Sequence, residues 1–188
     1  SSANFDKYPE LWMSNIELFL PQLRKFIKSD IKYNNIDNFS KNDRTLYNYF
    51  NKYGSDKGCE DGYWPIYTEI LKKYKDSKIR LLEIGLGTND STLISSMGAT
   101  SKTNFRCGSY VRTFRDYLEK AEIFRGNVDR NSLFTEDRIK TFYVNQLEFN
   151  SLNELNSKCG NKKFDIIIDD GLHSITVNLN TILIVPLT

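Results

Sequence analysis

A short apolar run that ends in two closely spaced glycines decides how this chain can fold: residues 79–89 read Ile-Arg-Leu-Leu-Glu-Ile-Gly-Leu-Gly-Thr-Asn. The apolar part is typical of a buried strand. Gly85 and Gly87 allow the backbone to turn tightly and let a ligand approach with no side chain in the way. A strand, such a turn, a second strand and an acidic residue hold nucleotide-like cofactors on open α/β sheets. An ordinary strand-to-loop turn can carry the same glycines. The choice between such a turn and a cofactor site therefore depends on the sequence that follows.

Strand and helix patterns alternate after this stretch, which predicts a doubly wound, mainly parallel sheet with helices on both faces. The predicted strands cover residues 79–84, 121–126, 139–144 and 164–168. The predicted helices between and after them cover residues 109–119, 149–157 and 174–184. Between the first strand and the first of these helices, the chain is polar and without a period, which is typical of a long binding loop or lid.

Three further helices are predicted ahead of the first strand, over residues 14–29, 43–53 and 65–74. We interpret the early helices as a cap, because no linker or internal repeat separates two domains. The chain is therefore divided into an N-terminal helical cap with a cofactor-covering loop, residues 1–62, and a Rossmann-like core, residues 63–188.

Composition excludes several classes of protein. The chain has 188 residues, enough for one domain with its own core, and a net charge of +2 with no basic stripe that would favour nucleic acid. Its three cysteines, Cys59, Cys107 and Cys159, fit neither a zinc site nor a disulfide framework, which favours a reducing, cytoplasmic setting. We expect no membrane span and no signal peptide, since no apolar run is long enough and the N-terminus lacks the required pattern.

Polar residues follow all four predicted strands. In chain order the strand ends deliver Glu83 with Gly85 and Gly87, then Asn127 and Asp129, then Asn145 and Gln146, and finally Asp169, Asp170 and His173. The carboxyl ends of parallel strands meet at one edge of a sheet, and ligands bind there where the strand order reverses. These residues are therefore expected to share one site.

His173, the only histidine of the chain, follows two carboxylates at the end of a predicted buried strand. An imidazole that titrates near neutral pH is suited to take a proton from a hydroxyl, although a lone histidine is often structural. Asp169 and Asp170 can bind a hard divalent cation such as magnesium, orient the imidazole ring, or cap the helix that follows.

Several of these motifs together resemble one group of class I S-adenosylmethionine-dependent methyltransferases, whose members methylate sugar hydroxyls in macrolide antibiotics and in bacterial surface polysaccharides. The matching motifs are Ser55-Asp56-Lys57-Gly58 followed by Tyr63, residues 83–89, residues 136–142, and Asp169-Asp170-Gly171-x-His173. The resemblance covers about residues 50–180 and rests on the combination, since each motif alone is common.

The resemblance implies a cofactor site. Gly85 and Gly87 would approach the methionine part of S-adenosylmethionine, with Glu83 supporting that turn. The loop that carries Asp56 and Lys57, together with Tyr63, would cover the cofactor or substrate. Asn145 and Gln146 would lie near the adenine.

The resemblance also implies the chemistry. Asp169 and Asp170 would bind magnesium and the acceptor's hydroxyls, Asp169 would border the cofactor, and His173 would be the general base, with Asp170 as its catalytic partner.

The sequence departs from the family at several positions. The acid that holds the ribose after the second strand is replaced by Asn127, so Asp129 can substitute there or become a third metal ligand. Asn145 stands where relatives carry Asp, and Asp61 where they often carry His. The family sheet has seven strands, of which four are legible, so the strand at 164–168 would be an exposed edge. Either the chain is a fragment, or a partner or second copy covers that edge.

The sequence therefore predicts an O-methyltransferase that acts on a hydroxyl of a sugar or related small molecule in polysaccharide or natural-product biosynthesis. An inactive or incomplete domain that serves as a scaffold is the main alternative, favoured by Asn127 and Asn145. A nicotinamide-dependent oxidoreductase is less favoured, because the third glycine of the dinucleotide fingerprint is missing.

Overall fold

The computed structural model describes residues 43–58, 62–85, 108–172 and 174–188. All of these lie in one compact unit, Phe39–Thr188. The predicted helix at residues 14–29 lies outside the described residues, and the division of the chain at residue 62 stays a prediction. Of the helices in the described part, none is both long and apolar enough to span a membrane.

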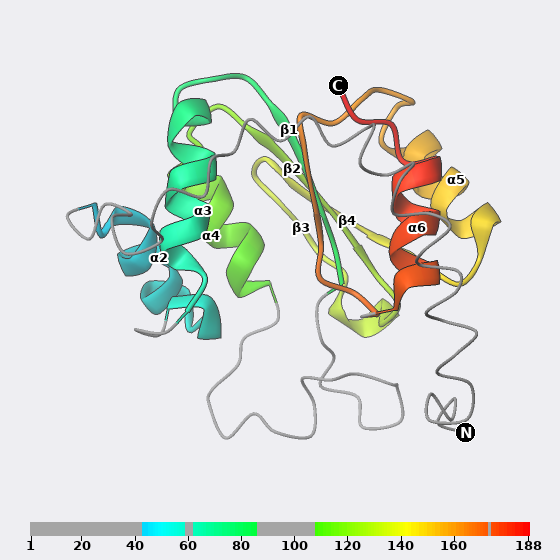
Figure 1. Cartoon of the computed structure of the whole chain (residues 1–188), viewed down its shortest axis with the longest axis horizontal. Coiled ribbons are helices and arrows are strands. Elements are labelled where there is room, and N and C mark those ends of the chain that lie inside the picture. Colours follow the sequence, from blue (N-terminus) through cyan, green and yellow to red (C-terminus); the bar gives the residue numbers. More distant parts are fainter. Residues whose placement is uncertain (1–42, 59–61, 86–107, 173) are drawn as a thin grey trace. The chain divides into compact units, whose positions relative to one another are not determined.

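A twisted five-stranded sheet lies at the centre of the unit, with the strand order β3-β4-β2-β1-β5 (Figure 1). The strands are β1 (Arg80–Ile84), β2 (Glu122–Asn127), β3 (Thr135–Glu136), β4 (Ile139–Tyr143) and β5 (Ile166–Asp169). All neighbours pair in parallel except β3 and β4, which are antiparallel. The predicted Rossmann-like, mainly parallel sheet is confirmed, and β3 is an addition, since two residues are too few to give a periodic signal.

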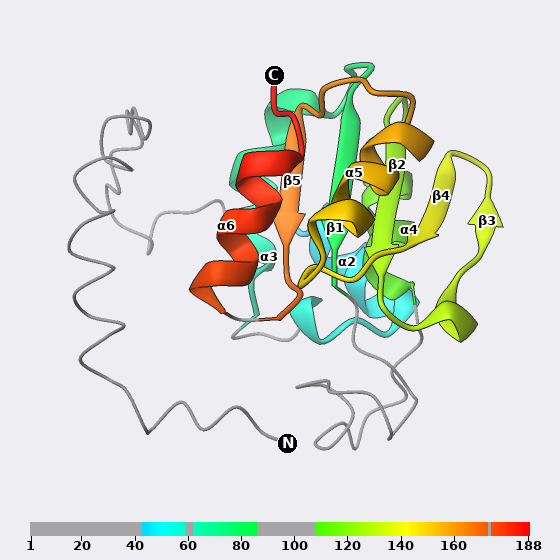
Figure 2. The same ribbon diagram turned by 90° about the vertical axis from the view of Figure 1, so that its right-hand side faces the viewer.

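Helices cover both faces of the sheet (Figures 1 and 2). On one face lie α2 (Thr45–Tyr53), α3 (Trp64–Leu71) and α4 (Ser109–Tyr117), and on the other lie α5 (Phe149–Lys158) and α6 (Ile175–Ile184). Every helix predicted within the described residues is present with slightly shifted ends, and the one predicted at 65–74 is divided into α3 and a 3₁₀ turn, Lys72–Tyr74.

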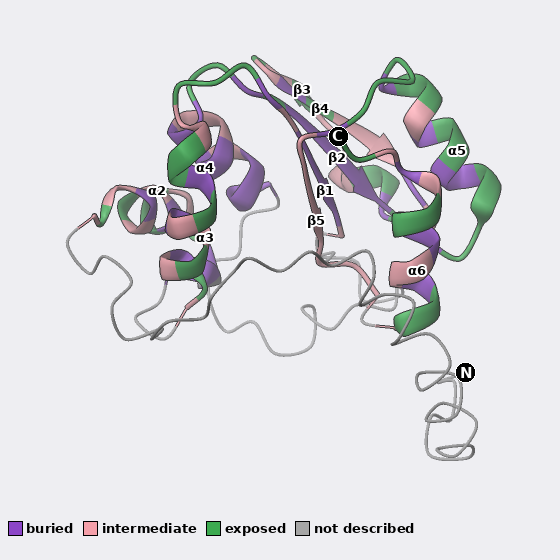
Figure 3. Ribbon diagram, turned by 45° about the horizontal axis from the view of Figure 1, so that its top comes forward, coloured by how far each residue is buried: buried purple, intermediate pink, exposed green. Residues whose placement is uncertain are grey.

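Each face of the sheet carries its own apolar core, because successive side chains of a strand point to opposite faces. Leu81 and Ile123 pack with Phe114 of α4 in one cluster, whereas Leu82 and Phe124 belong to the other. The inner strands β1 and β2 are almost entirely buried, as the burial colours in Figure 3 show. Such strands form the rigid frame on which the residues at their carboxyl ends are placed.

The fourth predicted strand forms an edge of the sheet, as expected. Just before β5, Phe164 makes an isolated parallel bridge with Leu187. The Phe164 amide donates to the Pro186 carbonyl, and the Thr188 amide donates to the Phe164 carbonyl. The apolar body of β5, residues 166–168, is only half-buried.

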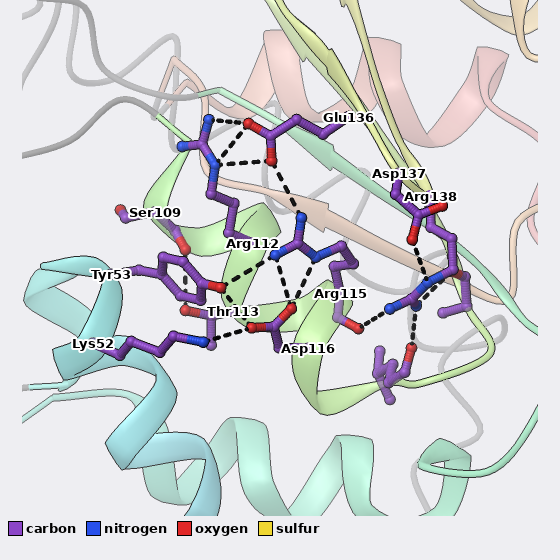
Figure 4. A network of polar contacts seen from close by, with 12 residues as sticks. Lys52, Tyr53, Ser109, Arg112, Thr113, Arg115, Asp116, Glu136, Asp137 and Arg138 are labelled. Atoms are coloured by element: carbon purple, nitrogen blue, oxygen red, sulfur yellow. Dashed lines mark hydrogen bonds and ion pairs between the residues drawn. The ribbon is translucent and has the colours of Figure 1, made fainter.

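The motif at residues 136–142 joins the β3–β4 hairpin to helix α4 (Figure 4). Arg112 Nη2 donates to Glu136 Oε1 at 2.6 Å, and Arg115 Nη1 donates to Glu136 Oε2 at 3.2 Å. Arg138 donates to the carbonyl oxygens of Leu118 and Arg115, both at 2.8 Å, and so satisfies the C-terminal end of α4. In this structure the motif therefore serves packing and helix capping.

Candidate active site

The strand order reverses between β1 and β5. The chain moves from β1 to β2 and β4 on one side and then returns to β5 on the other side of β1. Here the turn after β1 touches the segment after β5: the Asp170 amide donates to the Ile84 carbonyl at 2.8 Å. Gly85 has φ +92°, and a Cβ there would lie 2.3 Å from the Asp170 carbonyl oxygen, so only glycine fits. Gly87 lies outside the described residues.

Glu83 is a fully buried carboxylate beside this reversal point. It lies opposite Arg125 in the register of β1 and β2, with 4.0 Å between Glu83 Oε2 and Arg125 Nε. Neither Glu83 oxygen accepts a hydrogen bond from any described residue. Burial raises the pKa of Glu83 to about 7, against the opposing positive charges of Arg125 and Lys57. Unsatisfied buried carboxylates are rare and mark candidate ligand sites.

Lys57 extends to the end of β5. Its ammonium lies 2.6 Å from Asp170 Oδ2, although 113 residues separate the two in the sequence. The side chain of Lys57 is only 8% exposed. The ammonium also lies 4.5 Å from the ring centre of Tyr110 and 5.6 Å from that of Tyr63. A carboxylate and two aromatic faces therefore surround one buried cation.

The loop that carries Lys57 is fixed on helix α2. Gly54 ends α2 with the left-handed φ of 71°, which glycine allows, and the Ser55 amide donates back to Phe50 at 2.9 Å. A Cβ at Gly58 would lie 2.6 Å from the Cβ of Phe50, so glycine permits the close approach of loop and helix. The side chain of Asp56 is outside the described part of the chain.

Gln146 joins β4 to the segment after β5. Its Nε2 donates to Asp169 Oδ1 at 2.9 Å and to Thr181 Oγ1 of α6 at 3.0 Å, while its Oε1 accepts from the Leu172 amide at 3.2 Å. A Cβ at Gly171 would collide with this amide, at 1.9 Å from Oε1. Gln146 is buried, so the structure places it as a tie between elements rather than on an open surface.

Asp169 and Asp170 do not act as one chelating pair in this arrangement. Asp169 lies in register with Ile84 and contacts Gln146, whereas Asp170 points to Lys57 on the other face. Consecutive residues of an extended chain project in opposite directions. Within the described residues no three His, Cys, Asp or Glu side chains gather as a metal site. The donors that are described therefore do not fit magnesium, whose assignment to these two residues stays a prediction.

The position expected to hold a ribose is occupied by locally bonded groups. Asn127, the last residue of β2, donates from Nδ2 to Ser132 Oγ at 2.5 Å and accepts from the Val128 amide at 3.0 Å. Asp129 is buried and accepts from the Asn131 amide at 2.8 Å. Because residue 127 is an amide and residue 128 is valine, Asp129 is the first carboxylate along the chain after β2.

The position expected to border an adenine combines a polar turn with exposed apolar side chains. Asn145 donates from Nδ2 to Glu148 Oε1 at 2.7 Å, which closes the turn before α5. Val128, after β2, and Leu147, after β4, are 39% and 64% exposed at the carboxyl ends of two adjacent strands. Sites for small ligands are commonly lined by apolar side chains together with a few polar groups.

Tyr110 and Arg125 belong to the site but were not predicted from the sequence. Arg125 could have been found, since Glu83 and Arg125 are the single charges within residues 81–84 and 123–126, the inner parts of two strands that are otherwise free of charge there. Tyr110 carries no such signal, because an aromatic residue on a helix is usually part of the core. His173, the predicted base, lies outside the described residues.

Known proteins that resemble this chain carry out methyl transfer. No protein-family model matches the sequence. The demethylmacrocin O-methyltransferase of Streptomyces fradiae is 28% identical over 109 residues, which are 58% of this chain and 24% of that enzyme. The chain resembles, at a distance, the S-adenosylmethionine-dependent O-methyltransferases of macrolide sugars.

Solved structures give the same match for the fold. MycE, a methyltransferase of the mycinamycin biosynthetic pathway in complex with Mg, S-adenosylhomocysteine and mycinamycin VI, has a TM-score of 0.59 and 22% identity, covering 74% of this chain and 35% of MycE. A crystal form of MycE with Mg and S-adenosylhomocysteine has a TM-score of 0.58. The Rossmann-like methyltransferase fold predicted from the sequence is thereby confirmed. The chain spans about a third of the length of MycE and about a quarter of the length of the demethylmacrocin enzyme.

Proposed function

We propose that this chain is an O-methyltransferase that moves a methyl group from S-adenosylmethionine to a hydroxyl of a sugar or a related small molecule. The observation that carries the proposal is Glu83, a buried carboxylate with no hydrogen bond from a described residue, beside the glycine turn at the reversal point. The names of the distant relatives support the reaction class, methyl transfer. The sugar acceptor rests on the resemblance of the sequence motifs.

The described residues fit the cofactor. Glu83 would accept the ammonium of the methionine part, which supplies the hydrogen bonds and the charge that this carboxylate lacks. Gly85 would leave the backbone open to it. Val128 and Leu147 would border the adenine, and Asp129 would hold the ribose in place of the acid that Asn127 replaces.

S-adenosylmethionine, when bound, supplies an electrophilic methyl group. The acceptor hydroxyl has to lose its proton as its oxygen attacks, and we propose that His173 takes that proton. Asp170, held by Lys57 at the end of β5, would fix the acceptor through its hydroxyl groups. Because the described donors do not form a magnesium site, no step is assigned to a metal ion.

Calorimetric titration with S-adenosylhomocysteine tests the cofactor site. We expect micromolar binding to the unaltered chain and a loss of about tenfold or more in Glu83→Gln, since an amide lacks the charge that pairs with an ammonium. Glu122→Gln is the matched control, because Glu122 lies at the opposite end of β2 in an exposed pair with Arg80.

Absence of binding to the unaltered chain, with and without magnesium, would contradict the proposal. In that case the inactive scaffold becomes the better interpretation. Titration with NADH, followed by fluorescence, separates the oxidoreductase alternative from both.

A further inference from the structure

The positive charge next to Asp170 is a side chain of the protein, the ammonium of Lys57. We propose that the Lys57 ammonium is the resident cation of Asp170 and competes with divalent metal ions for that carboxylate. A metal ion at Asp170 would therefore require Lys57 to leave. The competition does not depend on whether the chain transfers methyl groups.

Three elements far apart in the sequence build the position of the Lys57 ammonium. Asp170 follows β5, Tyr110 lies in α4 and Tyr63 precedes α3. The contact of 2.6 Å between Lys57 Nζ and Asp170 Oδ2 is a short, charge-assisted hydrogen bond. The ring of Tyr110 at 4.5 Å adds a cation–π contact, which strengthens as water is excluded. Burial separates this pair from an exposed one such as Lys52–Asp116: the side chain of Lys57 is 8% exposed, and that of Lys52 is 57% exposed.

Backbone packing holds Lys57 in reach of Asp170. The loop is fixed on α2 through the Ser55 amide and through the close contact of Gly58 with Phe50. The Lys57 amide also donates to Ser55 Oγ at 3.2 Å. With the backbone held in this way, we expect the ammonium to leave Asp170 by rotation of its own side chain.

Positive charge is already present beside Asp170 without a metal ion. Lys57 lies against Asp170 and also acts on Glu83, and Arg125 lies 4.0 Å from Glu83. A dication placed on Asp170 beside the ammonium would meet strong repulsion, since like charges a few ångströms apart in a partly buried site are poorly screened by water. Asp169 does not add a ligand on that face, because its side chain projects to the other face of the sheet, where its Oδ1 accepts from Gln146.

Binding of Mn²⁺, measured by electron paramagnetic resonance of the free ion, tests the competition. We expect weak binding to the unaltered chain and an affinity gain of about tenfold or more in Lys57→Met, which removes the competing charge but can still pack on the tyrosine rings. Adding Asp170→Asn to Lys57→Met should abolish the gain. Lys52→Met is the matched control, because Lys52 pairs with Asp116 at 3.1 Å on the exposed side of α2.

Equal Mn²⁺ affinity in the unaltered chain and in Lys57→Met, including no binding to either, would overturn the proposal. So would a gain that persists when Asp170 is replaced. If Lys57→Met fails to fold by circular dichroism, acetylation of Lys57 in the unaltered chain replaces it as the measurement. Saturating Mn²⁺ should speed that acetylation, which mass spectrometry follows, and an unchanged rate would again overturn the proposal.

Discussion

At the scale of single residues, two buried ionic groups dominate the candidate site. Glu83 and Arg125 are almost completely shielded from water and lie 4.0 Å apart, too far for a hydrogen bond. Removing charges from water costs several kcal/mol per ion, and a loosely placed pair recovers little of it. A structure that keeps such a pair beside a glycine turn has a reason other than stability, and the proposed binding of an ammonium there supplies one.

His173 carries the residue-scale prediction for catalysis. We expect His173→Ala to lose nearly all methyl transfer while its affinity for S-adenosylhomocysteine stays unchanged, because a base acts on the acceptor and not on the cofactor. Ser174→Ala is the control: Ser174 precedes α6 and makes no side-chain capping hydrogen bond. Turnover of His173→Ala at the rate of the unaltered chain would remove His173 from the mechanism.

At the scale of secondary structure, the side chain of Gln146 joins several parts of the fold by hydrogen bonds. It lies at the end of β4 and bonds to the end of β5, to the loop after β5 and to α6. The loop contains Asp170 and continues to His173. Placement of Asp170 therefore depends on a neutral amide that follows another strand.

Replacement of Gln146 by Leu should destabilise the fold by about 2–3 kcal/mol. The half-buried carboxylate of Asp169 and the buried hydroxyl of Thr181 both lose the hydrogen bond that Gln146 Nε2 donates, and the Leu172 amide loses its acceptor. Urea unfolding measures the change. Asn145→Ala is the control, because Asn145 is half-exposed and bonds only within its own turn. Equal loss of stability in the two variants would show that the side-chain hydrogen bonds of Gln146 stabilise the fold no more than those of Asn145.

Periodic elements were predictable from the sequence, whereas long-range pairs were not. The apolar run at 79–84 and the helix faces gave the sheet and its helical layers, but β3 was missed, because two residues have no measurable period. The pairing of Lys57 with Asp170 depends on the final fold across 113 residues. Alternation alone could have predicted that Asp169 and Asp170 face opposite ways, but the resemblance to a metal-binding motif grouped them together.

At the scale of the whole molecule, ionisable groups act in opposite directions on stability. Hydrogen bonds from Arg112 hold the pKa of Glu136 below its ordinary value of 4.5, and burial raises that of Glu83 to about 7. Glu136 thus stabilises the fold above its unfolded pKa, and this contribution is lost as the pH falls through its folded pKa. Glu83 prefers to keep its proton in the folded state, so its contribution is lost as the pH rises from 4.5 to about 7.

The free energy of unfolding should therefore pass through a maximum in mildly acidic solution. Between pH 4.5 and 7 the free energy of unfolding should fall by about 3 kcal/mol, most of the value of a shift from 4.5 to about 7, because Glu83 releases its proton in the unfolded chain but keeps it in the folded protein. Urea unfolding at a series of pH values measures the profile. Glu83→Gln should remove this decline, whatever its effect on the absolute stability, and Glu136→Gln should reduce only the loss on the acidic side. A decline of unchanged slope in Glu83→Gln would mean that another group releases its proton over this range and that Glu83 is already ionised in the folded protein.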